Sequence, residues 1–453
     1  MVTTRLTNIP SFNELINNKP FMKPLRLNKV GYTTVEGTKY SIIKYDKTFL
    51  NNDLVPTLGL CRSVILNSSN RVVCYSPPKS LMLDIFREKY PDNINNNDND
   101  NNNDNDNDNT LVAEEFVDGS MINVFWDDKI GLTGGWEIAT RNTVGANTRF
   151  FVEPLNPLKK KTFREYFVDA LNECNLKLDK LNKEFCYSFV LQHPEYRIVA
   201  PITHPKLYLV AVYSIVYKKE PTIGPDVLAE PGAEPGTELE TTEVIDVITH
   251  DINEVKKYDW DGVMIHFPET IPFTRYEQLK AEYASGNTRY YVKGVVIKNT
   301  QTGERAKIRN PVYEEIKNLR GNSIHKLQYQ YLCLRRQGKV TDYLNYYPED
   351  KNTFTLYKKQ LHTFTTTLLS NYIDCYIRKN NALKNYNPNF RTHMYNIHQQ
   401  YMNELRHKKG YVNKSYVINY VNNLDVPLLM YTLNWEYRNT IYDDKKNKSI
   451  ALL

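Results

Sequence analysis

The periodicity of the apolar residues changes once along the chain, near Pro311. Over residues 32–306 they fall in short runs rich in β-branched and aromatic residues, such as CRSVIL, MINVFW and GVVIKN. Several runs alternate apolar with polar residues between turn residues, which predicts antiparallel strands. Beyond Pro311 apolar residues recur every three or four positions, which predicts helices. We therefore expect an α+β domain over residues 1–310, with antiparallel sheets and outer helices, and an all-helical domain over residues 311–453.

Helices are also expected inside the first domain, over residues 162–181 and 245–258, and five or six helices are expected in the second. Two segments read as insertions. Residues 92–109 (DNINNNDNDNNNDNDNDN) carry six Asp and no base, so they cannot bury enough apolar surface to fold and are expected to be disordered. Residues 220–243 are acidic and contain Pro and Gly, and are expected to form a long surface loop.

The charge of the chain favours a polyanionic partner. The formal net charge is +6 although residues 92–109 are acidic, so the folded part is more basic than the total suggests. Such a surface suits RNA, DNA or nucleotide phosphates, although a merely soluble basic protein would look the same. No run approaches the roughly 20 apolar residues of a membrane span, and the N-terminus lacks a signal-peptide pattern. We expect no membrane partner and an intracellular, cytoplasmic location.

The start of the helical domain is its most basic part. Residues 305–339 hold nine basic and two acidic side chains, with tyrosines between them. Basic groups beside aromatic rings suit single-stranded nucleic acid. The alternative is a solvated helix face whose tyrosines pack inward. The candidate RNA-binding residues are Lys317, Arg320, Lys326, Arg335 and Arg336.

Five segments carry a resemblance to a known family. They are similar, in the same order, to motifs of the adenylyltransferase domain of ATP-dependent RNA ligases of the T4 RNA ligase 1 kind. The segments are residues 62–79, 114–122, 136–143, 189–210 and 293–313. The resemblance implies a nucleotidyltransferase fold for residues 1–310, with ATP and Mg²⁺ as cofactors and RNA or a nucleotide as partner. The helical domain lies outside it, and the second segment is the most informative.

The second segment reads EEFVDGSMI, where the family has a Lys followed two residues later by Asp-Gly. In the family that Lys attacks the α-phosphate of ATP. Phe116 stands in its place and has no nucleophilic atom, so covalent enzyme–AMP cannot form there. Asp118 and Gly119 are retained, either because the turn needs them or because Asp118 contacts a ribose. An ordinary Asp-Gly hairpin turn is the alternative.

The other departures from the family follow charge. Five positions that face ATP phosphates in the family keep a cation here: Arg62, Lys79, Arg141, Lys307 and Arg309. Two acidic positions are lost, to Val190 and Lys293, unless the second acid is instead Asp261 in residues 261–264. We prefer the alignment through Lys293 because its distance to Lys307 fits better. No spacing of His or Cys suggests a dedicated metal site.

Three functions follow from this resemblance. The preferred one is a catalytically impaired RNA ligase-like protein that binds RNA or nucleotide phosphates in a basic pocket. The second is an active ligase with a relocated lysine such as Lys129 or Lys293. The third is a structural or virion-associated protein on the same fold. The chain also resembles proteins of large DNA viruses of protists, which implies the host cytoplasm or the virion. Protein partners are not predicted.

Overall fold

A computed structural model describes residues 1–17, 24–34, 37–92, 110–149, 161–221, 241–321 and 327–438. The chain divides into two compact units. The first joins Met1–Arg149 to Lys161–Glu315, and the second contains the helices that follow Ile316. The division falls inside α6 (Pro311–Arg320), a few residues beyond the change of periodicity.

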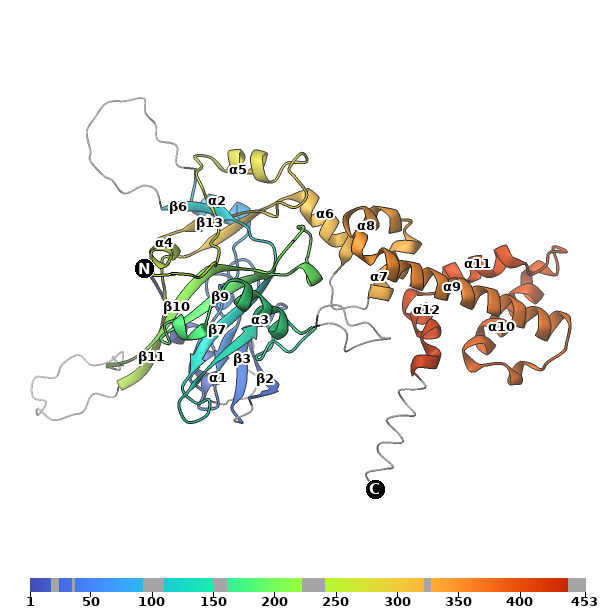
Figure 1. The fold of residues 1–453 in the computed structure, drawn as a ribbon, viewed down its shortest axis with the longest axis horizontal. Coiled ribbons are helices and arrows are strands. Elements are labelled where there is room, and N and C mark those ends of the chain that lie inside the picture. The colour runs from blue at the N-terminus through green and yellow to red at the C-terminus, as the bar shows by residue number, and fades with distance from the viewer. Residues whose placement is uncertain are drawn as a thin grey trace, which may run out of the picture. The chain divides into compact units, whose positions relative to one another are not determined.

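The first unit is built on three antiparallel sheets (Figure 1). The first sheet has the order β1-β11-β10-β9-β7-β8. Its strands are β1 (Val2–Arg5), β7 (Ser120–Asp127), β8 (Gly135–Thr140), β9 (Phe185–Gln192), β10 (Lys206–Pro221) and β11 (Thr241–Thr249).

The other two sheets have four strands each. The second sheet, in the order β12-β6-β13-β14, comprises β6 (Leu111–Glu115), β12 (Thr270–Ile271), β13 (Gly294–Asn299) and β14 (Arg305–Arg309). The third sheet, in sequence order, comprises β2 (Leu25–Thr33), β3 (Lys39–Tyr45), β4 (Val64–Leu66) and β5 (Val72–Tyr75).

Apolar faces join these sheets to each other and to the helices. The third sheet packs on the first through a core that includes Ile42, Ile65, Phe125 and Tyr213. The second sheet buries one face against α2 (Leu83–Lys89) and α5 (Tyr276–Tyr283). The short helices α1 (Phe12–Ile16) and α4 (Ile252–Lys256) and the longer α3 (Phe163–Glu173) complete the unit.

Strand β14 gives the second sheet two chemically different faces. Its sequence is RAKIR, and side chains alternate along a strand. Ala306 and Ile308 belong to the apolar core with α2 and α5. Arg305, Lys307 and Arg309 therefore lie on the opposite face. That face is the one that carries the candidate site.

Two expectations about helices need correction. Residues 245–258 do not form one helix, because β11 continues to Thr249 and only Ile252–Lys256 is helical. β11 is held by strand pairing on both sides, with β1 and with β10, which outweighs its helical spacing. The helix expected over residues 162–181 begins with a Thr162–Glu165 capping box but ends at Glu173. Asn175, in the left-handed conformation with φ of 53°, follows that end.

The two expected insertions lie mostly outside the described residues. Of residues 92–109, the structure describes only Asp92, whose carboxylate accepts a hydrogen bond from the Tyr276 amide. At the acidic segment, β10 continues to Pro221 and β11 starts at Thr241, so the ends of the expected loop are strand residues. Residues 222–240 lie outside the described part of the chain.

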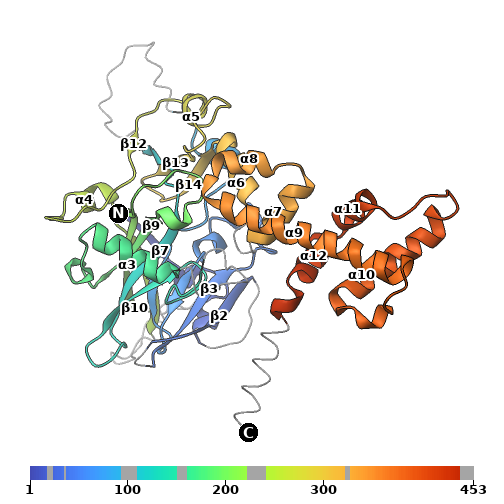
Figure 2. The ribbon, with the colours of Figure 1, turned by 45° about the vertical axis from the view of Figure 1, so that its right-hand side comes forward.

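The second unit is helical, with α9 at its centre (Figure 2). With α6 included, the described residues of this unit form seven α-helices, whereas five or six were expected. Their bounds are α6 (Pro311–Arg320), α7 (Leu327–Arg336), α8 (Val340–Tyr346), α9 (Lys351–Tyr372), α10 (Pro388–Gln400), α11 (Lys414–Asn423) and α12 (Val426–Leu433). α9 buries Phe354, Leu361 and Leu368, and it contacts α7, α10, α11 and α12. Among the described residues, no helix is both long and apolar enough to cross a membrane.

Candidate functional site

The Asp118-Gly119 turn links two different sheets. It joins β6 of the second sheet to β7 of the first, and these strands do not pair with each other. It is therefore not a hairpin turn, and that alternative is wrong. Gly119 has φ of 141°, and a Cβ there would lie 2.5 Å from the Leu191 carbonyl oxygen and 2.8 Å from the Val190 side chain. Only glycine fits this close approach to β9.

Asp118 is a buried anchor in this turn. One carboxylate oxygen accepts hydrogen bonds from the amides of Val199 and Ala200, at 3.1 and 3.0 Å. The other accepts a 2.5 Å bond from the Tyr313 hydroxyl and lies 3.8 Å from Lys293 Nζ. Both oxygens thus have protein partners, which favours a role in holding the turn over a role in contacting a ribose.

Phe116 is surrounded by cations. Its amide donates to the Gly294 carbonyl at 3.1 Å, which fixes the end of β6 beside the start of β13. Lys293 Nζ lies 4.2 Å and Lys307 Nζ 4.3 Å from the ring centroid, and the Arg309 guanidinium carbon lies 5.7 Å from it. All three are within cation–π range of one ring, and Lys307 makes this contact when it is protonated. Phe116, which the motif resemblance aligns with the family's nucleophile, thus packs against these basic side chains.

Further cations come from the third sheet and the turn that follows it. The Lys79 amide donates to the Gly59 carbonyl at 2.9 Å, and the Arg62 guanidinium reaches the Pro77 carbonyl at 3.5 Å. Arg305 of β14 donates to the Pro78 carbonyl, so β14 and this turn are tied together. Burial, then Arg305 and Arg141, lower the pKa of Arg62 to about 10. Burial, then Arg62, Arg309 and Arg305, also lower the pKa of Lys79.

Lys307 experiences the strongest effect of this crowding. Burial is the main cause, and the nearby charges of Arg305, Arg62, Lys293 and Arg309 add to it, so that its pKa falls to about 6. The Nε atoms of Arg62 and Arg305 are buried and have no hydrogen-bond partner among the described residues. An anion with several oxygens would satisfy these donors and relieve the repulsion. The arrangement therefore suits a phosphate or a polyphosphate.

The structure thus brings together most of the residues predicted to bind phosphates. Arg62, Lys79, Lys307 and Arg309 influence one another directly, and Arg141 lies close enough to lower the pKa values of Arg62 and Lys44. Sequence reasoning missed Arg305 as a member of this cluster. The signal was present in RAKIR, because its three basic residues occupy alternate positions and share one face of a strand.

The two alternatives for the lost acidic motif lie in different places. Lys293 directly precedes β13, which pairs with β14 so that Gly294 lies opposite Arg309. Residues 261–264 form a turn after α4, where the Met264 amide donates to the Cys174 carbonyl. The alignment through Lys293 therefore falls on the β13–β14 strand pair, next to the basic cluster, and the alignment through Asp261 does not.

Lys129 is not available as a relocated nucleophile. It lies in the turn after β7, where its ammonium is 3.4 Å from Asp128 and its carbonyl accepts from Thr38. At about 3.3 Å per residue, the eight residues of β7 put this turn roughly 25 Å from Asp118 at the strand's other end.

The residues predicted to bind RNA do not form one uniform surface. Arg320 is buried, lies 4.5 Å from the Tyr347 ring centroid and pairs with Glu349 at 3.6 Å. Arg335 donates to Asn422 at 2.5 Å. Lys317 is half-buried and Arg336 is exposed, whereas Lys326 lies outside the described residues.

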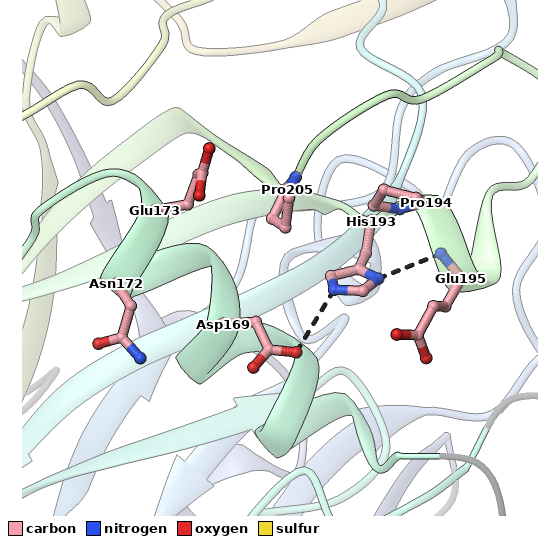
Figure 3. A pocket seen from close by; sticks show the side chains of 7 residues that line it. All are labelled: Asp169, Asn172, Glu173, His193, Pro194, Glu195 and Pro205. Carbon is pink, nitrogen blue, oxygen red and sulfur yellow. Dashed lines mark hydrogen bonds and ion pairs between the residues drawn. The ribbon is translucent and has the colours of Figure 1, made fainter.

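Two hollows accompany the site. One, of about 420 Å³, follows the polar face of the second sheet and is lined by Lys79 and Arg305 as well as by Glu114 and Lys298, which form an ion pair. The other, of about 490 Å³, has three acidic side chains, and Figure 3 shows Asp169 directed towards His193. Their closest atoms are 3.4 Å apart. Its negative charge does not suit phosphate, so only the first hollow extends the cationic cluster.

The cluster fits phosphates better than a resident metal ion. The carboxylate of Asp118 is already engaged, and the positions that the motif resemblance aligns with two acids of the family hold Val190 and Lys293. In the part of the chain that the structure describes, no group of three or more His, Cys, Asp or Glu side chains is placed to bind a metal. A divalent cation would therefore have to come with the nucleotide phosphates.

A sequence comparison finds one partial similarity, to an RNA ligase. A 104-residue stretch is 29% identical to an RNA ligase of Rhodothermus phage RM378, and it covers 22% of this chain and 22% of that protein. The match thus spans about a fifth of the relative's length. This sequence similarity supports an RNA ligase-like protein. No protein-family model matches the chain.

Two solved structures of an RNA ligase from Naegleria gruberi are also similar. A mutant with ATP and Mn has a TM-score of 0.28 at 12% identity, covering 46% of this chain and 51% of that one. A second mutant, in the apo form, has a TM-score of 0.27 at 12% identity, with coverage of 45% and 50%.

Proposed function

We propose that this RNA ligase-like protein binds the phosphates of a nucleotide such as ATP, or of an RNA end, in its cationic pocket without covalent nucleotidyl transfer. The observation that carries the proposal is the set of cations around Phe116. Lys293, Lys307 and Arg309 surround one ring. Two carboxylates offset part of this charge, Asp118 at 3.8 Å from Lys293 and Glu314 at 3.0 Å from Arg309. Because Lys307 is largely neutral above its pKa of about 6, the net positive charge of the pocket comes mainly from Arg62, Lys79 and Arg305, and this charge favours polyanions.

The pocket residues divide into two groups according to their sheet. Lys307 and Arg309 lie on β14, and Arg62 and Lys79 flank β4 and β5 of the third sheet. Phosphate oxygens held between these groups would pair with charges from both sheets. A bound phosphate also favours the protonated form of Lys307, because an opposite charge stabilises the ammonium ion.

Covalent transfer lacks its reacting group in this proposal. Phe116 cannot attack phosphorus, and Val190 cannot act as an acid or a base. Val190 lies against Gly119, where a larger polar side chain would meet the buried turn. The substitutions remove chemistry and keep the positive charge, which is the expected pattern for binding alone.

A second candidate function is supported by the position of two lysines. Lys293 Nζ lies beside both the Phe116 ring and Asp118, and Lys307 has a pKa of about 6, which leaves a neutral amine above that pH. In this candidate, the amine attacks the α-phosphorus of ATP, a phosphorus–nitrogen bond forms, and pyrophosphate leaves as the proton passes to solvent. The third possibility, an assembly protein on the same fold, would bind no nucleotide.

The test is a binding titration of the full chain with ATP and with 5′-phosphorylated RNA at fixed salt. Replacing both Lys307 and Arg309 by Ala should weaken binding at least tenfold, which corresponds to about 1.4 kcal/mol. Lys358→Ala with Lys359→Ala is the matched control, because both lysines are exposed on α9. Unchanged affinity in a folded pocket variant would refute the pocket. Absence of any binding by the wild type would favour the assembly protein.

A further inference from the structure

The helices α9 and α10 of the second unit run in the same direction. Phe364 of α9 stacks on Phe390 near the start of α10, with ring centroids 5.2 Å apart. Further along both helices, Tyr376 stacks on His398, with ring centroids 3.9 Å apart and planes 12° apart. Contacts that advance along both helices together require parallel helices. The C-terminal ends of α9 and α10 therefore point the same way.

Both helices end in a π-helical turn followed by a basic segment. The π turns are Ile373–Ile377 after α9 and Tyr401–Leu405 after α10. The residues that follow include six exposed cations: Arg378, Lys379, Lys384, Arg406, Lys408 and Lys409. Because the helices are parallel, two basic segments that are distant in the sequence lie at one end of the unit.

The positive charge of this end has little internal compensation. None of the six cations forms an ion pair with another described residue. Asp374 lies nearby and offsets one of these charges: hydrogen bonds from the Tyr386 hydroxyl, Asn381 and Asn380, at 2.6, 3.1 and 2.6 Å, and the charge of Arg378 lower its pKa and favour the carboxylate. Glu404 is the other nearby acid and is exposed. The charge is thus available to an external partner.

An exposed aromatic ring lies directly beside these cations. Tyr411 is 73% exposed, two residues after Lys409, which has a positive φ of 51°. The Gly410 amide donates to the Leu405 carbonyl at 2.8 Å, which folds the segment back on the end of the helix. A ring offered to solvent among cations is the combination that binds single-stranded nucleic acid, where phosphates pair with the cations and a base stacks on the ring.

We propose that this basic end, defined by the six cations and Tyr411, is a second polyanion site that binds single-stranded RNA. The RNA backbone pairs with the two basic segments, and one base stacks on Tyr411. The site lies wholly within the second unit and uses none of the pocket residues. It is also more accessible than the basic surface expected over residues 317–336, where Arg320 is buried.

The experiment uses the full chain and a fluorescent 20-nucleotide oligouridine with a 5′-hydroxyl, so that no terminal phosphate reports on the pocket. Lys408→Glu with Lys409→Glu should weaken RNA binding at least tenfold. The slope of log affinity against log salt should become shallower by about 0.7 for each phosphate that the variant no longer neutralises. Lys358→Glu with Lys359→Glu makes the same charge change on the exposed side of α9 and should stay within twofold of wild type.

The aromatic ring has its own matched pair of variants. Tyr411→Ala should weaken RNA binding about five- to tenfold, within the roughly 1–3 kcal/mol expected for one stacked base. Tyr395→Ala removes another exposed tyrosine, on α10, and should leave the affinity unchanged. Binding of ATP should be unaffected by either change.

Two results would overturn the basic end as an RNA site: unchanged RNA affinity in the Lys408/Lys409 variant, and equal weakening in that variant and its control. Unchanged RNA affinity combined with a loss of binding to phosphatidylserine vesicles would assign the basic end to a lipid surface. Failure of the proposed pocket would look different. ATP would then not bind, while the Lys408/Lys409 variant would still lose RNA binding.

Discussion

Phe116 changes what the surrounding cations can do. In a site with a nucleophilic lysine at this position, positive charge would serve a covalent step. Here the ring packs against Lys293, Lys307 and Arg309, and no reacting atom lies at its centre. In the proposed function, the same cations hold an anion and do not transfer it.

Phe116→Lys alone should not restore ligation. The new ammonium group would lie among Lys293, Lys307 and Arg309, and the acid missing at Val190 would still be absent. We expect no RNA joining and no accumulation of AMP on the protein, as measured with labelled ATP and a 5′-phosphorylated RNA. Efficient ligation by this single variant would show that Val190 and Lys293 matter less than proposed.

Lys307 should make stability depend on pH. Its pKa is about 6 in the folded protein against an ordinary value of 10.5, so between these values the unfolded chain binds more protons. Stability should therefore rise with pH across this window. In urea denaturation, the wild type should gain stability relative to Lys307→Met between about pH 6.5 and 8.5. An equal pH response of both proteins would contradict the depressed pKa.

At the scale of elements, the site depends on how the second sheet meets the first. The two faces of β14 separate an apolar core from a row of cations, and the Asp118-Gly119 turn carries the chain from β6 to β7. The turn is tight because Gly119 passes close to the Leu191 carbonyl. Positions of this kind tolerate no side chain without a shift of backbone.

Gly119→Ala should destabilise the protein by about 1–3 kcal/mol, because its φ of 141° is strained for alanine and its Cβ would meet β9. Gly286→Ala is the control, since a Cβ there would meet nothing within 4 Å. Urea midpoints of the two variants give the comparison. Equal midpoints would show that the turn is not constrained as described.

Sequence patterns predicted the strands better than the helix ends. Alternation in RAKIR reports which face of the strand is buried, and the structure follows it. The segment 245–258 misled because a strand with several consecutive apolar residues can resemble part of a helix. Arg320 could not be placed from sequence, since its burial against Tyr347 depends on how α6 meets the helices that follow.

The gathering of the cations was predictable only in part. Motif order linked Arg62, Lys79, Lys307 and Arg309, but no pattern gave the cation–π contacts or the buried Nε of Arg305. The basic end was missed for a related reason. In the sequence, neither of the two basic segments, residues 378–384 and 406–411, is unusual by itself. Only the parallel course of α9 and α10 brings them to one end of the unit.

At the scale of the whole molecule, the two units each carry one proposed polyanion site. Saturating ATP should therefore compete for the pocket and leave the basic end free. In wild type, excess ATP should reduce but not abolish the binding of 5′-phosphorylated RNA. In the Lys408→Glu, Lys409→Glu variant the same ATP should remove most of the remaining binding. Complete displacement of RNA from the wild type by ATP would contradict two separate sites.

The most direct test of phosphate binding without covalent transfer is to incubate the wild type with α-labelled ATP and Mg²⁺ and to divide the sample. One half is measured for bound ATP at equilibrium, and the other is denatured and examined for label on the protein. We expect bound ATP that is released on denaturation, with no covalent label. A labelled band that disappears in Lys293→Arg or Lys307→Arg would contradict this expectation and would establish a displaced nucleophile.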